Sequence, residues 1–243
     1  MNERPPIVVL GANHAGTRLV VDILRTLGSA AGRIDNEWLE DETFLEIHRR
    51  LIGRVAGKGW TDTIFDMEFV QSYRDDARLV PEMRDWLAQS LSDSFPDRTA
   101  PWHWKCPTAV MFLPSWTEIF PEALFVHIER DSTEVARSLV RRRQFLGFGR
   151  AAAFYEAMNR RILEARGTMK NYVRLSMESL GDGLPALVEM AGLDPGQEAL
   201  LRARRGIRLD PARGWRADRS VLGNLWEATT NFRAAVRGRN GKR

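Results

Sequence analysis

The feature that most constrains the fold is a glycine-bounded segment between a short apolar run and an amphipathic stretch. The run Ile7–Leu10 has the length and composition of a buried strand, and it stops at Gly11. In the following stretch, residues 17–27, apolar side chains recur at helical spacing, at Leu19, Val20, Ile23, Leu24 and Leu27. A strand, a glycine-bearing turn and a helix in this order predict the start of an α/β domain.

The same alternation continues along the chain. Further strands are expected at residues 102–106, 123–128 and 172–175, and further helices at 42–55, 81–92, 109–120, 133–145, 151–165 and 184–191. This order predicts a three-layer α/β fold of the P-loop-like kind, with a mostly parallel central sheet flanked by helices. Ligands of such sheets bind beyond the carboxyl ends of the strands. The turns after Leu10 and Ile128 are therefore expected to open onto the binding site.

Charge and composition exclude several classes of protein. We expect one domain over residues 1–243, with a basic, partly irregular C-terminal segment at about 206–243. Residues 213–243 hold eight basic and two acidic side chains, whereas the whole chain has a formal charge of +4. The basic excess is therefore confined to the end and does not indicate a nucleic-acid partner.

No apolar run approaches the ~20 residues of a membrane span. Residues 1–6 lack the pattern of a signal peptide and Cys106 is the single cysteine, so a cytoplasmic location is expected.

The segment from Gly11 to Arg18 predicts a phosphate-binding loop. Its glycines have the G-x-x-x-x-G spacing of a Walker A loop, in which backbone N–H groups and the helix dipole hold an oxyanion. A nucleoside-triphosphate site also needs a lysine after the second glycine and then a Ser or Thr for magnesium, whereas this chain has Thr17 and Arg18 there. The loop can hold phosphate, but ATP hydrolysis is disfavoured. The alternative interpretation is that Gly11 and Gly16 only permit a tight turn.

A second anion site is predicted after the strand at 123–128. Arg130 follows that strand, and Ser138 lies eight residues later, inside the next expected helix. Both side chains can converge on one phosphate through charge-assisted hydrogen bonds. The alternatives are an ion pair of Arg130 with Asp131 or Glu134, and an ordinary helical position for Ser138.

An ordered set of segments resembles the sulfotransferases that use 3′-phosphoadenosine 5′-phosphosulfate (PAPS). The segment from Gly11 to Arg18 is similar to their 5′-phosphosulfate loop, particularly the form G-x-x-K-G-G-T-R. Residues 125–139 resemble their 3′-phosphate element, in which Arg and Ser are eight positions apart. Lys105-Cys-Pro107 is similar to their K-[ST]-P strand end, and residues 173–180 resemble their Y-E-D-L segment. The likeness covers about residues 7–194.

The resemblance implies a set of donor contacts and no metal. It assigns the 5′ end of PAPS to the loop residues and the 3′ phosphate to a strand end and helix, with one further contact from the late basic loop Arg213-Gly-Trp-Arg216. The residues are Asn13, His14, Ala15, Gly16, Thr17, Arg18, Arg130, Ser138 and Arg213. No His, Cys and carboxylate cluster with ligand spacing occurs in the sequence.

Two departures from the family concern catalysis. His14 stands where Lys or Arg is usual, so we expect His14, helped by Lys105, to stabilise the leaving oxygen. Thr108 replaces a histidine that serves as the base in some members, so the general base must come from elsewhere. Glu37 is the first candidate because glycan-type members have an acidic residue there. His103 is the second, and Asp66 and Glu68 are third.

The function expected from these residues is sulfuryl transfer from PAPS to a hydroxyl or amine. The acceptor would be a small molecule or a glycan, and the sequence does not indicate which one or any oligomeric state. Trp102 and Trp104 could line an acceptor pocket, although core packing is the favoured interpretation, because aromatic side chains in buried strands need no ligand to explain them. Two other functions remain open: a nucleotide or small-molecule kinase with a degenerate loop, which would bind magnesium and ATP, and a nucleotide-binding module without turnover.

Overall fold

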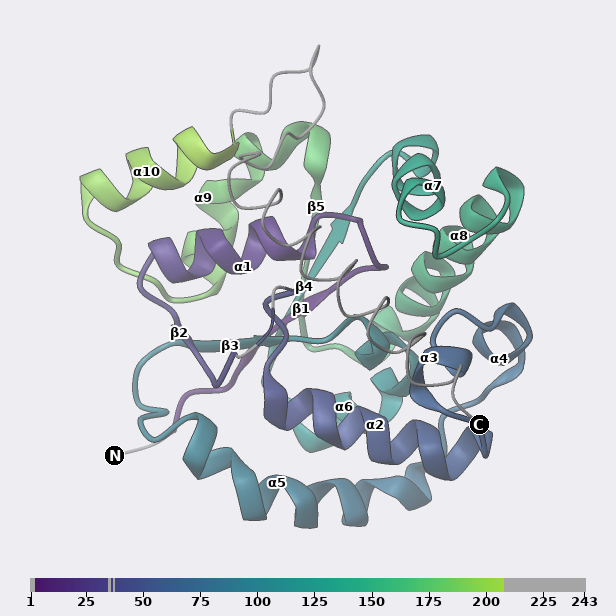
Figure 1. Ribbon diagram of the computed structural model, residues 1–243. Helices are drawn as coiled ribbons and strands as arrows, with labels where there is room; N and C mark the ends of the chain where they lie inside the picture. Colours follow the sequence, from purple (N-terminus) through teal and green to yellow (C-terminus); the bar gives the residue numbers. More distant parts are fainter. Residues whose placement is uncertain (1–2, 35, 37, 208–243) are drawn as a thin grey trace, which may run out of the picture. The chain divides into compact units, whose positions relative to one another are not determined.

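The computed structural model describes residues 3–34, 36 and 38–207. The predicted residues Glu37 and Arg213, and nearly all of the C-terminal segment, lie outside these ranges. The described part contains one five-stranded sheet in the order β2-β3-β1-β4-β5, in which every neighbouring pair is parallel (Figure 1). The strands are β1 (Ile7–Leu10), β2 (Ala30–Ala31), β3 (Trp102–Lys105), β4 (Leu124–Glu129) and β5 (Asn171–Ser176).

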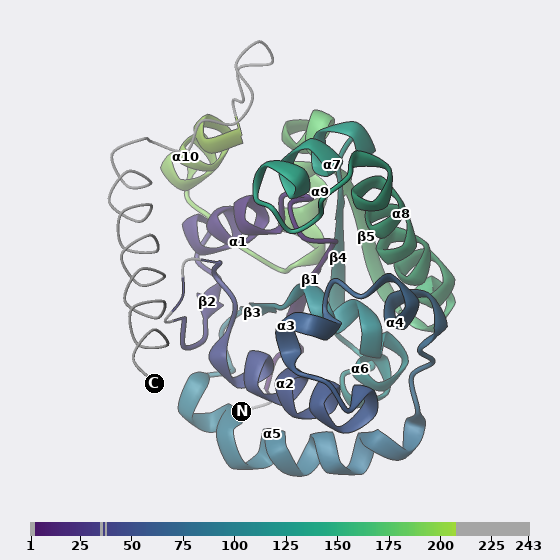
Figure 2. The same cartoon turned by 45° about the vertical axis from the view of Figure 1, so that its right-hand side comes forward.

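Helices cover both faces of this sheet. One group is α1 (Thr17–Thr26), α9 (Leu180–Met190) and α10 (Gln197–Ile207). The other group includes α2 (Glu42–Ala56), α5 (Val80–Ser94), α6 (Leu113–Ile119) and α8 (Phe148–Ala165). Figures 1 and 2 show these groups on opposite sides of the strands, with α7 (Ser132–Arg141) beside α8 and the short helices α3 (Trp60–Thr63) and α4 (Met67–Ser72) near the end of α2. The predicted three-layer α/β architecture is confirmed.

Successive side chains of a strand point to opposite faces of the sheet, so each strand contributes to the core on both faces. Val8 and Leu10 of β1 and Phe125 of β4 belong to a large buried cluster with side chains of α2, α5, α6 and α8. Val9 and Val126 are also fully buried but lie outside that cluster, on the other face of the sheet. Strands buried on both faces are expected to read as continuous apolar runs, as these do.

The tryptophans of β3 belong to the core. The Trp104 ring stacks on Phe44 of α2 with ring centroids 3.9 Å apart, and the Trp102 indole N–H donates to the carbonyl of Arg4 at 2.8 Å. Both side chains are nearly inaccessible to solvent. The core interpretation of these residues is therefore correct, and they do not line an acceptor pocket.

Several boundaries differ from the sequence prediction. The expected helix at 109–120 is a 3₁₀ helix, η2 (Pro107–Phe112), followed by α6, because Pro114 has no N–H and fits only the first turn of a helix. The short elements β2, α3 and α4 and the longer helix α10 were not predicted. Asp131, and not Ser132, caps α7, since its carboxylate accepts the N–H of Glu134 at 3.0 Å. Among the described residues, no helix is both long and apolar enough to cross a membrane.

Candidate functional site

The register of the sheet brings four strand ends to one edge. Val9 of β1 lies beside Lys105 of β3, Leu10 lies beside His127 of β4, and Glu129 of β4 lies beside Ser176 of β5. The residues that follow these strands therefore share a common region, as the rule for parallel sheets requires. This edge holds the Gly11–Arg18 loop, Lys105 and Arg130.

The N-terminus of α1 is open to an anion. Gly16 is its N-cap residue, with φ 108°, and no side chain caps the first turn, which also contains no acidic residue. Glycine is favoured at this position, because side chains rarely adopt a φ of 108° and a Cβ atom there would also lie 2.3 Å from the sulfur of Met177, which would have to move. Backbone N–H groups without a side-chain cap and the positive end of the helix dipole give this turn the properties of an anion site.

His14 connects the loop to α7 and to the segment after it. Its Nε2 donates to the side-chain oxygen of Gln144 at 3.0 Å, and its Nδ1 accepts from the hydroxyl of Ser138 at 3.1 Å. Burial lowers the pKa of His14 to about 4, and the positive charges of Arg142 and Arg130 act in the same direction, while the bond to Gln144 opposes them. The imidazole is therefore neutral in this structure. The backbone of His14 has a φ of 68°, in the left-handed region.

Lys105 is buried at the end of β3. Its ammonium group donates to the carbonyl of Trp38 at 2.7 Å and to the Glu40 carboxylate at 3.2 Å, and only 3% of the lysine side chain is exposed. Burial lowers the pKa of Lys105, and the neighbouring Glu40 opposes this shift. The guanidinium of Arg142 lies over the Trp38 ring, 5.3 Å from its centroid. A cation and a carboxylate thus meet beside the phosphate loop.

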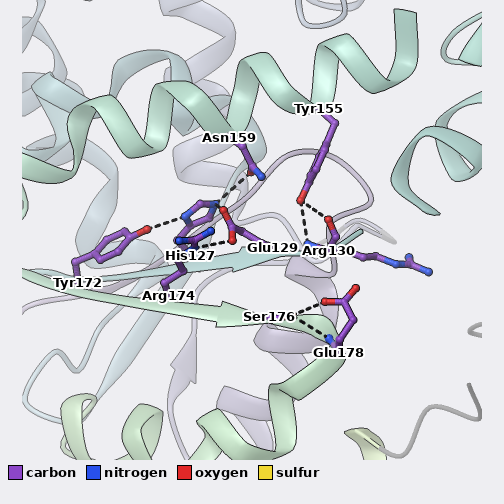
Figure 3. Close-up of polar contacts among 9 residues, drawn as sticks. All are labelled: His127, Glu129, Arg130, Tyr155, Asn159, Tyr172, Arg174, Ser176 and Glu178. Carbon is purple, nitrogen blue, oxygen red and sulfur yellow. Dashed lines mark hydrogen bonds and ion pairs between the residues drawn. The ribbon is translucent and has the colours of Figure 1, made fainter. Parts of the chain in front are cut away.

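Arg130 is held through its backbone by α8 (Figure 3). The hydroxyl of Tyr155 accepts the N–H of Arg130 at 2.9 Å and donates to the carbonyl of the same residue at 2.6 Å. The next N–H, that of Asp131, donates to Glu178 at 2.9 Å. The guanidinium of Arg130 lies 3.7 Å from Glu134, so the ion pair considered from the sequence is present.

A buried polar network lies beneath Arg130. His127 is fully buried in β4, where its Nδ1 accepts from the Tyr172 hydroxyl at 2.8 Å and its Nε2 donates to Asn159 at 3.2 Å (Figure 3). Burial lowers the pKa of His127. Arg174 donates to Glu129 at 2.6 Å on the same side. These bonds satisfy polar groups that would otherwise destabilise the strand end.

The structure groups some of the predicted site residues and separates others. Asn13 and Ala15 lie in the turn with His14, Thr17 and Arg18 are the first residues of α1, and Ser138 contacts His14 directly. The base candidates His103, Asp66 and Glu68 lie elsewhere. His103 is in the core, bonded to Ser29 at 2.9 Å, and burial lowers its pKa to about 3. Asp66 caps α4, and Glu68 lies in the first turn of that helix.

Three contacts were missed from the sequence, and their residues are Glu40, Gln144 and Tyr155. Each forms its contact with a residue far away in the chain, so no local spacing pattern indicates it. For Glu40 a weak signal existed, because it lies three positions from the predicted Glu37 in the same acidic segment.

Comparison with known proteins identifies the family. Residues 5–180 match the model described as the sulfotransferase family. The chain belongs to the sulfotransferase family. Membership supports sulfuryl transfer as the general activity of this sulfotransferase. No curated protein matches its sequence.

Solved structures of sulfotransferases share the fold. The sulfotransferase domain of the Synechococcus PCC 7002 olefin synthase matches with a TM-score of 0.55 and 18% identity, over 86% of this chain and 82% of that chain. Sulfotransferase STF9 from Mycobacterium avium matches with a TM-score of 0.53 and 16% identity, over 87% and 69%. The sulfotransferase domain of the curacin biosynthetic pathway matches with a TM-score of 0.50 and 18% identity, over 83% and 78%. At these identities the likeness shows the fold.

Within the described ranges, no group of three or more His, Cys, Asp or Glu side chains gathers as a metal site would require.

Proposed function

We propose that this sulfotransferase moves a sulfuryl group from PAPS to a hydroxyl or amine of a small-molecule or glycan acceptor. The observation that carries the proposal is the open N-terminus of α1, which lies at the same sheet edge as Lys105 and Arg130. An anion-binding turn without a Walker lysine, next to a second strand-end cation, suits a donor with phosphates at two positions better than it suits magnesium and ATP.

The loop and two strand ends would divide the recognition of the donor. The N–H groups of residues 13, 14 and 16–18 and the side chain of Arg18 would hold the 5′ end, whereas the N–H of Ala15 already donates to the carbonyl of Ala12 at 3.1 Å. Arg130 and Ser138 would hold the 3′ phosphate, which requires Arg130 to exchange Glu134 for the ligand, and Ser138 to exchange His14. The existing contacts are between polar groups that a phosphate oxygen can replace, so the residues fit such a donor.

His14 and Lys105 would stabilise negative charge on the leaving oxygen. PAPS supplies an activated sulfuryl group, whose S–O bond to the phosphate breaks as the acceptor oxygen or nitrogen bonds to sulfur. Nε2 of His14 already carries a proton and donates it to Gln144, so it can donate to a phosphate oxygen instead. The buried Lys105 ammonium acts in a poorly solvated site, where its charge is weakly screened.

Glu40 is the carboxylate that we assign as the general base. It lies beside Lys105 and is 14% exposed, so the acceptor can reach it from solvent while it stays next to the reacting groups. In this role it would take the proton of the acceptor hydroxyl as the bond to sulfur forms. Glu37, the candidate from the sequence, lies outside the described residues and competes with Glu40 for the assignment.

A calorimetric comparison tests the donor class. The full chain is titrated with 3′-phosphoadenosine 5′-phosphate (PAP) and, separately, with ADP plus magnesium. We expect PAP to bind more tightly. Equal or tighter binding of ADP would reject the proposal in favour of a kinase, and tight PAP binding without turnover of PAPS would indicate a binding module.

The Arg130→Ala variant tests the assigned 3′ site in the same assay. We expect it to weaken PAP by about thirtyfold, or ~2 kcal/mol, and to leave the 3′-hydroxyl analogue unaffected. Arg137→Ala is the matched control, because Arg137 also pairs with Glu134, at 2.6 Å, but is 62% exposed. Equal losses for both ligands would refute the role of Arg130.

A further inference from the structure

The segment between α7 and α8 carries an exposed apolar tip surrounded by cations. Leu146 is completely exposed and Phe148, the first residue of α8, is 47% exposed. The exposed arginines around them are Arg141, Arg142, Arg143 and Arg150. Residues 135–155 contain no Asp or Glu, so nothing within this stretch neutralises the charge. We call residues 141–150 the basic-apolar loop.

Two of its arginines stand where local stability favours other residues. Arg143 follows the cap residue of α7 with φ 57°, and the N–H of Gln144 donates to the carbonyl of Leu139 at 3.1 Å. This is the Schellman arrangement, in which glycine is the preferred residue at the position of Arg143. Arg150 lies in the first turn of α8, where the helix dipole favours acidic residues. Both choices cost stability and both add charge to the same surface.

The apolar residues break a second local rule. The fully exposed Leu146 gains nothing from the hydrophobic effect in the isolated chain, and the half-exposed Phe148 gains only part of what full burial would give. Neighbouring Phe145 is buried and anchors the segment, so the tip is held outward by the fold. Residues that break local rules without benefit to the fold are expected at functional surfaces.

We propose that the basic-apolar loop docks this protein on a bilayer that contains anionic lipids. Leu146 and Phe148 insert at the boundary of headgroups and acyl chains, and the surrounding arginines contact lipid phosphates. Charge complementarity selects an anionic surface, and the apolar tip selects a bilayer over a dissolved polyanion, which offers nothing to bury it. Gln144 in the same loop contacts His14, so docking brings the phosphate loop to the membrane surface.

Vesicle co-sedimentation of the full chain tests the proposal. The vesicles are phosphatidylcholine alone, or phosphatidylcholine with phosphatidylglycerol. We expect binding to the anionic vesicles, which Leu146→Ser with Phe148→Ser weakens about tenfold at unchanged net charge. Arg143→Gly with Arg150→Glu should also weaken binding to the anionic vesicles at least tenfold, because the loss of each arginine is expected to weaken it about fivefold. The arginine variant improves both helix ends, so misfolding does not explain a loss.

A matched control comes from α10. Leu201→Ser with Arg204→Glu removes an apolar side chain that is 46% exposed and an exposed arginine, from a helix that Figures 1 and 2 show on the other side of the sheet from α7 and α8. This variant should bind vesicles as the wild type does. The basic segment 213–243 is present in every variant, so the differences between variants report the loop. If the serine variant binds the anionic vesicles as the wild type does, charge alone explains the attraction and the proposal is overturned. A loss of binding in the α10 control as large as in the loop variants would also overturn it.

Discussion

At the scale of single residues, the neighbours of Lys105 decide what the site can do. Its ammonium group is shared between the carbonyl of Trp38 and the carboxylate of Glu40. A carboxylate in this position both stabilises the lysine charge and can accept a proton. As a general base the carboxylate would promote turnover, whereas as the partner of Lys105 it would compete with the donor. Turnover and donor affinity, measured separately, therefore distinguish the two roles.

The Glu40→Gln variant is expected to lower the turnover of PAPS without weakening PAP. Loss of a general base costs about a hundredfold or more in rate. Donor affinity should stay equal or increase, because Lys105 no longer has an internal anion to exchange for the phosphosulfate. PAP release from PAPS, with water as the acceptor, measures the first effect and calorimetry the second. Glu37→Gln is the comparison, and a loss of turnover there, with none in Glu40→Gln, would transfer the role to Glu37.

At the scale of elements, α8 positions the end of β4. The Tyr155 hydroxyl is bonded to both backbone groups of Arg130, so one side chain fixes the direction in which the strand ends. We therefore regard Tyr155 as a positioning residue for the proposed 3′-phosphate contact. The same helix supplies Asn159 to the His127 network, so α8 is bonded both to β4 itself and to the residue that follows the strand.

The Tyr155→Phe variant should weaken PAP about tenfold, because both bonds to the backbone of Arg130 are lost. In an Arg130→Ala background the same change should have no further effect, a result that general loosening of the fold would not give. Calorimetry on the four proteins of this cycle measures it. Tyr73→Phe is the control, since the buried Tyr73 hydroxyl makes no hydrogen bond within the described residues. Additive losses in the double variant would contradict a role through Arg130.

At the scale of the whole molecule, all four histidines of the chain are held neutral by burial. Burial lowers the pKa of His14 to about 4 and the pKa values of His48 and His103 to about 3, and it also lowers that of His127. His48 illustrates the geometry, because Nδ1 donates to the carbonyl of Phe44 and Nε2 accepts from the Trp116 indole. A protonated ring could not accept that second bond.

These shifts predict that acid destabilises the protein. An unfolded histidine binds a proton near pH 6.5. The folded histidines bind theirs only at lower pH, so the unfolded state holds more protons and the free energy of unfolding falls as pH falls below about 6.5. Burial raises the pKa of Asp41 to about 6, which gives the folded state an extra proton in the same range and offsets part of the loss. For the three histidines whose pKa falls to about 3 or 4, less the offset from Asp41, the net loss between pH 7 and pH 5 is on the order of 4 kcal/mol, and His127 adds to it in the same direction.

Urea unfolding at several pH values between 7.5 and 5 measures this dependence. His103→Gln should flatten the curve, because it removes one of the buried titrating groups. A free energy of unfolding that stays constant over this range would contradict the prediction.

The sequence by itself determined the order of the elements and the edge of the sheet where the site lies. Apolar runs of strand length alternate with helical patterns, and parallel strands must bring their carboxyl ends to one edge, so the positions of the Gly11–Arg18 loop and Arg130 followed from local pattern alone. The predicted helix ends were less accurate. The helix predicted for residues 133–145 ends at Arg141, because the turn after α7 has Arg143 at a position where a sequence pattern would show glycine.

Only the tertiary structure decided which side chains meet at that edge. Glu40 reaches Lys105, Gln144 and Ser138 reach His14, and Tyr155 holds Arg130, across separations of 25 to 130 residues. Such contacts depend on how helices pack on the sheet, and residue spacing along one element carries no information about them. The loop after β1 and the cation Lys105 could therefore be predicted for this site, whereas the carboxylate of Glu40 and the bonds of Tyr155 to the backbone of Arg130 required the fold.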